Sequence, residues 1–199
     1  MLLRIAIPVI SGLSLVVSVL VAWDSRRQIR RAERIKLAAY ADELNQVQVE
    51  WEKLLLDRES VPSSLGVAFN ERRELLASQA KKLVSTYRKD VSSREYGTLA
   101  WAYRLLNDSE SARAMYTNAI RAADLEGPAY AAASERTFGE FLCYLGAAAD
   151  GREHFRRSVD LTSGTDNLAL YFRAETLMMW ARVEHEIDPA GVARACSLD

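Results

Sequence analysis

The chain has 199 residues, of which 49% are hydrophobic, with only four prolines and nine glycines. Once a membrane segment is set aside, this length suits a single soluble domain, and so few turn-forming residues disfavour a β-sandwich. We expect an all-α fold. The formal net charge of −1 provides no broad positive surface, so no nucleic-acid partner is expected.

Residues 1–23 contain an apolar run. From Ile5 to Trp23 the sequence has no charged residue, and as a helix this run spans about 28 Å, close to the thickness of the hydrocarbon core. A cleaved signal peptide would carry its basic residues before the apolar core, whereas here they follow it. The run therefore predicts an uncleaved, single-pass transmembrane anchor.

Residues 24–36 form a basic collar. The collar holds six basic and two acidic side chains, a charge of +4, whereas residues 37–199 hold 19 basic and 25 acidic ones, a charge of −6. Basic residues beside a membrane helix stay in the cytoplasm and can contact anionic lipid headgroups. We therefore expect the N-terminus outside and the C-terminal domain in the cytoplasm. The membrane-proximal basic residues are Arg26, Arg27, Arg30, Arg31, Arg34 and Lys36.

A homodimer is an open alternative on two grounds. Ser14, Ser18 and Ala22 form a ridge of small residues that could let two anchors approach closely, although such residues are also ordinary in a membrane helix. An apolar stripe after the collar could likewise form a coiled-coil seam between two copies.

Residues 37–91 are predicted to form an α-hairpin. Two apolar stripes at helical spacing are separated by residues 61–66, which contain Pro62 and Gly66 and should turn the chain. Packing of the two stripes within one chain is favoured over the seam. The first stripe is Leu37, Tyr40, Leu44, Val47, Trp51 and Leu54; the second is Leu76, Ala80, Leu83 and Tyr87, widened by Leu75 and Val84.

Residues 92–199 begin at a capping box, Ser92 with Glu95, and contain a candidate repeat. Small and large apolar residues between 99 and 124 resemble the pattern of one tetratricopeptide repeat, and weaker copies follow within 138–161 and 180–196. The resemblance implies about two to three degenerate helical hairpins; an irregular helical bundle without a groove is the alternative. The pattern rests on Leu99, Ala100, Ala102, Tyr103, Ala112, Tyr116 and Ala119, then on Phe138, Gly139, Phe141, Leu142, Gly151, Phe155 and Ser158, and lastly on Trp180, Ala181 and Ala193.

In that family the first helix of each pair faces the ligand. Three arginines with two aromatic residues could hold an acidic peptide, since guanidinium groups suit carboxylates. The alternative is that Trp101 and Tyr144 belong to the core and the arginines are solvated. Carried over by alignment, the predicted partner-binding residues are Arg94, Trp101, Arg104, Leu105, Arg136, Glu140 and Tyr144.

No catalytic pattern accompanies these helices. The sequence has no glycine-rich phosphate loop and no nucleophile turn, and its two histidines, His154 and His185, lack the spacing of metal ligands. His154 is expected on a polar helix face, and Cys143 and Cys196 as buried, reduced side chains. We expect no enzyme activity, no metal and no cofactor.

The sequence thus predicts a membrane-anchored adaptor or scaffold that binds one or more unidentified proteins through its helical repeats. The alternative is a small accessory subunit that stabilises a larger membrane complex. Four segments are expected: the anchor (1–23), the collar (24–36), the α-hairpin (37–91) and the repeat domain (92–199).

Overall fold

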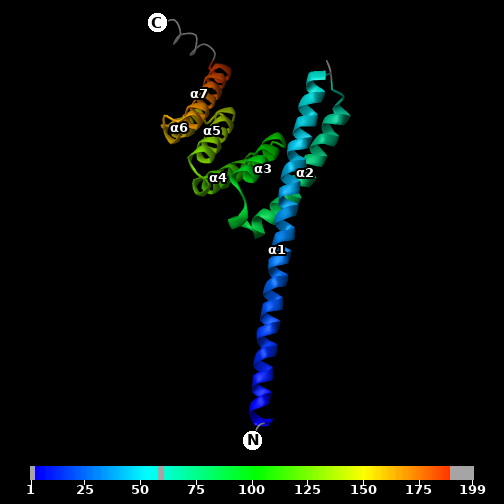
Figure 1. Cartoon of the computed structure of the whole chain (residues 1–199). Helices are drawn as coiled ribbons and strands as arrows, with labels where there is room; N and C mark the ends of the chain where they lie inside the picture. The colour runs from blue at the N-terminus through cyan, green and yellow to red at the C-terminus, as the bar shows by residue number, and fades with distance from the viewer. Residues whose placement is uncertain (1–2, 58–60, 189–199) are drawn as a thin grey trace.

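The computed structural model describes the backbone of residues 3–57 and 61–188, and the side chains from residue 18 onward except that of Lys89. Within this part the chain forms α-helices joined by short connections and no β-strand, which confirms the predicted all-α class (Figure 1). The elements are α1 (Leu3–Asp57), α2 (Ser63–Thr86), the 3₁₀ turn η1 (Arg88–Asp90), α3 (Ser93–Leu105), α4 (Ser109–Glu126), α5 (Pro128–Tyr144), α6 (Ala148–Leu161) and α7 (Asn167–Ile187).

Helix α1 is continuous over 55 residues, so the basic collar and the first helix of the predicted hairpin belong to one element. No proline or glycine occurs between Leu13 and Asp57 to interrupt it. Figure 1 shows the N-terminal half of α1 extending alone, away from the other helices.

The predicted anchor lies mostly outside the described side chains, which begin at residue 18, and so does Ser14 of the small-residue ridge. Among the described residues, no helix offers an apolar stretch of the length that a bilayer crossing requires.

The C-terminal half of α1 packs against α2. Leu37, Leu44 and Val47 are buried in the core, and the ring of Trp51 lies 5.3 Å from that of Phe69. The first stripe therefore packs within the chain, as favoured from the sequence.

The packing face of α2 differs in detail from the prediction. Leu75 is exposed, whereas Ala77 is fully buried and its carbonyl accepts a hydrogen bond from the Tyr103 hydroxyl at 3.2 Å. Small residues at Ala77 and Ala80 let α2 approach its neighbours closely, and Leu75 lies about 100° around the helix from Leu76. The turn is also shorter than residues 61–66, since α2 begins at Ser63.

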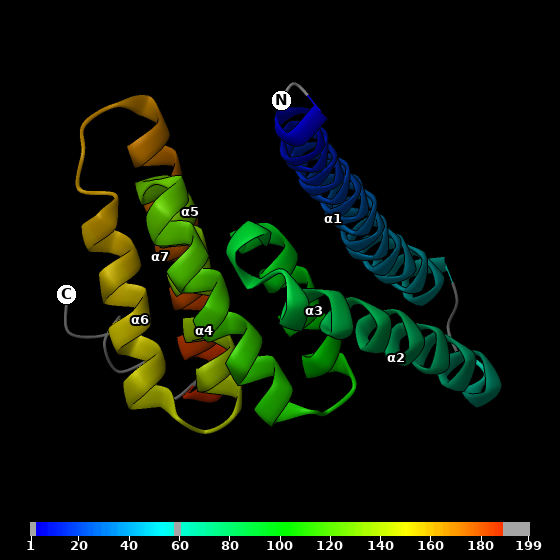
Figure 2. The same ribbon diagram turned by 90° about the horizontal axis from the view of Figure 1, so that it is seen from below.

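Helices α3 and α4 pair into one hairpin and α5 and α6 into a second, with α7 packed against both members of the second (Figure 2). The predicted capping box opens α3: Ser92 and Glu95 exchange both hydrogen bonds. Between the hairpins, the buried ring of Tyr116 lies 5.6 Å from that of Phe138 and 5.0 Å from that of Phe141.

The second hairpin depends on two glycines. A methyl group added at Gly139 would lie 2.8 Å from the Gly151 carbonyl oxygen, and one added at Gly151 would lie 2.4 Å from the sulfur of Cys143. The backbones of α5 and α6 therefore approach closely only because both residues are glycine. Cys143 is buried and unpaired with another cysteine, as predicted, while Cys196 and Ala193 lie outside the described residues.

Candidate functional site

The first helices of the successive pairs lie next to one another. Contacts join α1 to α3, α3 to α5 and α5 to α7. Residues three and four apart on α3, α5 and α7 contribute to one shared face, which we call the α3–α5–α7 face. It comprises Arg94, Gly97, Trp101 and Arg104 from α3; Tyr130, Ala133, Thr137, Glu140 and Tyr144 from α5; and Leu168, Phe172, Glu175, Arg182 and Glu186 from α7.

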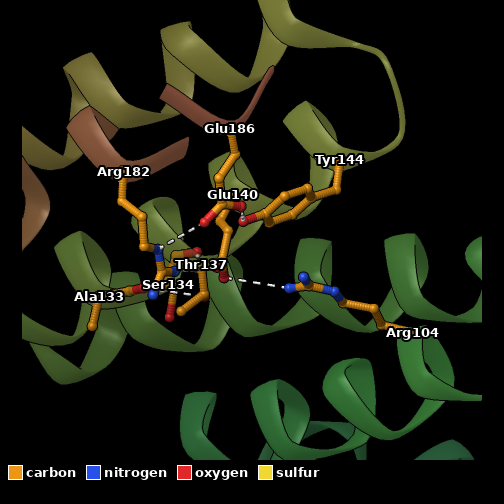
Figure 3. A network of polar contacts seen from close by, with 8 residues as sticks. All are labelled: Arg104, Ala133, Ser134, Thr137, Glu140, Tyr144, Arg182 and Glu186. Atoms are coloured by element: carbon orange, nitrogen blue, oxygen red, sulfur yellow. Dashed lines mark hydrogen bonds and ion pairs between the residues drawn. The ribbon is translucent and has the colours of Figure 1, made fainter. Parts of the chain in front are cut away.

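At one end of this face, Arg104 lies between two aromatic rings. Its guanidinium carbon is 4.5 Å from the centre of the Trp101 ring and 4.9 Å from that of Tyr144. Its Nη1 is also 3.3 Å from a carboxylate oxygen of Glu140 (Figure 3). Two cation–π contacts and an ion pair therefore fix this side chain.

Glu140 joins α3 to α7. Its second oxygen accepts a hydrogen bond from Arg182 at 2.7 Å, so both carboxylate oxygens are used. Beside it, the Tyr144 hydroxyl donates to Glu186. Partial burial and this hydrogen bond raise the pKa of Tyr144 to about 12, which keeps the phenol protonated as a donor. We call these residues the polar network: Trp101, Arg104, Glu140, Tyr144, Arg182 and Glu186.

Charge reversal of a merely exposed arginine would leave the fold intact, but Arg104 is not such a residue. Only 22% of the Arg104 side chain and 8% of the Glu140 side chain are exposed. Removing the cation would leave a buried carboxylate with one fewer partner, so Arg104 also supports the fold.

The remaining predicted residues lie outside the polar network. Arg136 faces α7 and pairs with Glu175 at 2.8 Å, and its buried Nε has no hydrogen-bond partner among the described residues. Leu105 is half buried beyond Arg104, and Arg94 is exposed at the far end of the face. The structure therefore brings together four of the seven predicted residues: Trp101, Arg104, Glu140 and Tyr144.

The opposite end of the face is hollowed into an apolar pocket of about 480 Å³. It opens between α3, α5 and α7, with the buried Ala119 of α4 between α3 and α5. Arg94 is the one charged residue in its lining, and no described carboxylate lies within ion-pair distance of it. The lining is Ser93, Arg94, Gly97, Ala119, Ala129, Tyr130, Ala133, Ser134, Thr137, Leu168 and Phe172.

Sequence reasoning missed Tyr130, Leu168 and Phe172. The second repeat was aligned from Phe138, but α5 begins ten residues earlier, at Pro128. Proline at a first helical position and the spacing of Tyr130, Ala133 and Thr137 could have revealed this earlier turn. For α7 no comparable pattern was present. Its pocket residues, Leu168 and Phe172, come before the third copy of the repeat pattern, which begins at Trp180.

The basic collar divides into two groups. Arg26, Arg27, Arg30, Arg31 and Lys36 are exposed, and Arg27 also lies over the Trp23 ring at 5.5 Å.

Arg34 instead forms a paired hydrogen bond with both carboxylate oxygens of Glu95, the capping residue of α3. Burial alone would raise the pKa of Glu95, but hydrogen bonds from Arg34 and Ser92 more than offset it and lower that pKa. The neighbouring Glu33 accepts a hydrogen bond from the Tyr87 hydroxyl. These contacts fix the collar helix to the start of α3 through Glu95 and to the end of α2 through Tyr87.

The prediction for His154 was wrong. Its ring lies 4.6 Å from that of Phe138, and its Nδ1 contacts the buried carboxylate of Glu135. Helix α6 packs this face on α5, so the ring is part of the interface. His185 is exposed, and the described residues contain no group of three or more potential metal ligands.

Comparison with protein-family models, with curated proteins and with solved structures finds no match for this chain.

Proposed function

We propose that the protein is a membrane-tethered adaptor that holds another protein at a bilayer through the α3–α5–α7 face. The main observation in support is the apolar pocket, which is concave, has a volume in the range of ligand sites and is lined by one cation, Arg94, that has no ion-pair partner among the described residues. The proposal includes a tetratricopeptide-like arrangement of the helices. Hairpins stacked in chain order support it, as does the distance of 35 residues from the start of α3 at Ser93 to that of α5 at Pro128, close to the family's period of about 34.

The tether in this proposal is the apolar run from Ile5 to Trp23, with the N-terminus outside and the C-terminal domain in the cytoplasm. It rests on the sequence: an uncharged stretch of suitable length followed by the basic collar. Five collar residues with exposed side chains suit anionic headgroups, whereas Arg34 is held by Glu95. A C-terminal reporter enzyme that works only after export would overturn this orientation.

A second candidate function is that of an accessory subunit in a larger membrane complex. The observation in its favour is the outer side of α7, where Leu170, Leu177 and Met178 are at least 47% exposed on the last described helix of the stack. An apolar end on a stack of helical hairpins usually needs a cover.

Copurification separates the two candidates. The full chain, tagged at its C-terminus, is isolated in mild detergent and its partners are identified by mass spectrometry before and after a wash at high salt. An adaptor should recover a soluble protein whose capture falls when Tyr130 is replaced by Asp at the pocket rim. An accessory subunit should retain membrane-embedded proteins irrespective of that change, and this result would end the adaptor proposal.

A further inference from the structure

Gly97 is the feature of the apolar pocket that the fold itself does not explain. It lies in the middle of α3, where glycine is less favourable than alanine, yet a methyl group added there would meet no atom within 4 Å. Gly139 and Gly151 differ, because neighbouring backbone fills the space beside them. The space in front of Gly97 is open and available to another molecule.

Two of the hydroxyl groups around this space are already hydrogen-bonded, and Arg94 is the one charged side chain among the described lining residues. The Ser93 hydroxyl donates to Glu126 at 2.5 Å, and the Thr137 hydroxyl donates to the carbonyl groups of Ala133 and Ser134 at 3.1 Å each. The remaining lining is largely apolar. A molecule that matches this lining is apolar over most of its contact surface and carries one anionic group for Arg94.

The shape of the opening favours a protein segment over a fatty acid. Tyr130 is 56% exposed and Leu168 is 60% exposed at its rim, so the pocket is an open depression on the surface. An acyl chain would leave much of its length in water there, whereas a peptide can insert side chains and keep its backbone outside.

We infer that the pocket binds a partner segment that inserts a bulky aliphatic or aromatic side chain between α3, α5 and α7 and places an Asp or Glu carboxylate against Arg94. The inference rests on the proposed function and specifies its partner. It moves the anion-binding role from the polar network, where Arg104 is already paired, to Arg94.

The test uses the full chain in lipid nanodiscs, with a displayed library of short random peptides as the probe. The wild type should enrich peptides with a bulky apolar residue close to an acidic one. With Arg94→Glu the acidic preference should disappear and basic residues should replace it. An unchanged preference in Arg94→Glu, or none in the wild type, would overturn the inference.

A matched pair of glycine variants tests the location. For the best peptide, measured by fluorescence polarisation, Gly97→Leu should fill the pocket and weaken binding at least about 10-fold. Gly97→Ala should stay within about twofold of the wild type. Circular dichroism and melting curves show whether both variants are folded; equal binding by a folded Gly97→Leu protein would exclude this pocket.

Two outcomes separate this inference from the proposed function. If Tyr130→Asp loses a copurifying partner but Arg94→Glu and Gly97→Leu capture it as well as the wild type does, the adaptor proposal stands and the pocket inference fails. If a fluorescent fatty acid binds in an Arg94-dependent way and no peptide is enriched, the pocket is a lipid site and the inference also fails. Absence of both a partner and enriched peptides would reject both.

Discussion

The α5–α6 interface and the pocket between α3 and α5 show two opposite uses of a helical glycine. At Gly139 and Gly151 glycine removes atoms so that two backbones can touch. At Gly97 it leaves a hollow that no described residue fills. A small residue in a helical repeat can therefore indicate either tight packing or an available site, and only the surroundings distinguish the two.

The largest effect should come from closing the tighter of these spaces. Gly151→Ala puts a methyl group 2.7 Å from the Gly139 carbonyl oxygen and closer still to the Cys143 sulfur. We expect a loss of about 2 to 3 kcal/mol in the free energy of unfolding, seen as a fall in melting temperature of roughly 4–12 °C. Gly97→Ala is the control and should be neutral or stabilising, by up to about 1 kcal/mol. Equal losses in both would remove the contrast between the two sites.

The two ends of the α3–α5–α7 face give the next prediction. Arg104→Glu places a second carboxylate beside buried Glu140 and loses both aromatic contacts, so it should destabilise the fold by about 2 kcal/mol or more in thermal melts. Arg94→Glu, at the apolar end, should change stability by less than about 0.5 kcal/mol, because Arg94 has no ion-pair partner among the described residues. Comparable melting temperatures would show that the polar network contributes little to the fold.

The two groups of collar residues should differ by a smaller amount in their contribution to stability. Arg34→Met keeps the aliphatic part of the side chain but leaves Glu95 without its guanidinium partner, which should lower stability by about 1 to 2 kcal/mol. The same change at exposed Arg31 should have no measurable effect on melting. If both variants melt alike, Arg34 does not fix the collar to α3.

The pH dependence of stability under acidic conditions tests the same contact between Arg34 and Glu95. Because the pKa of Glu95 is lowered in the folded protein, its contribution is complete above the unfolded value of about 4.3 and is lost as the pH falls through the folded value. Arg34→Met removes the part of this contribution that comes from Arg34 and leaves the hydrogen bonds from Ser92, so its loss of stability on acidification should be shallower than that of the wild type. Denaturant titrations at a series of acidic pH values measure the difference; parallel curves would contradict it.

The smallest effect should come from Tyr144→Phe, which removes the hydrogen bond to Glu186 and keeps the ring over Arg104. Tyr144 is partly exposed, so we expect a loss of about 0.5 kcal/mol. Tyr144→Ala, which also removes the ring, should lose roughly twice as much. A larger effect of the phenylalanine variant would mean that the hydroxyl, and not the ring, supports the network.

The parts of the fold that the sequence predicted depend on neighbours along the chain. The capping box at Ser92 and the apolar stripe beginning at Leu37 are local patterns, and both are present. Trp101 and Arg104 share a face because they are three residues apart, as the cation–π contact between them shows.

The missed features depend on residues far apart in the chain. Arg34 was assigned to the membrane surface from its charge alone, because its partner Glu95 is 61 residues away. The pocket combines α3 with Tyr130 of α5 and Leu168 of α7, and no spacing rule connects the three. The partial burial of His154 could not be predicted from local spacing either, because its contacts Glu135 and Phe138 come from another helix.

For the membrane-tethered adaptor proposed above, the continuity of α1 has a consequence for the position of a bound partner. Each helical residue adds about 1.5 Å of height and 100° of rotation, so the number of residues between Trp23 and Arg34 sets both together. Two residues inserted there would raise the pocket by only about 3 Å but turn it to nearly the opposite side of the tether. Seven would lift it by about 10 Å and leave its direction almost unchanged. If the proposed tether holds the chain at a bilayer, the height of the pocket above it and the direction in which the pocket opens are both set by the length of a single helix.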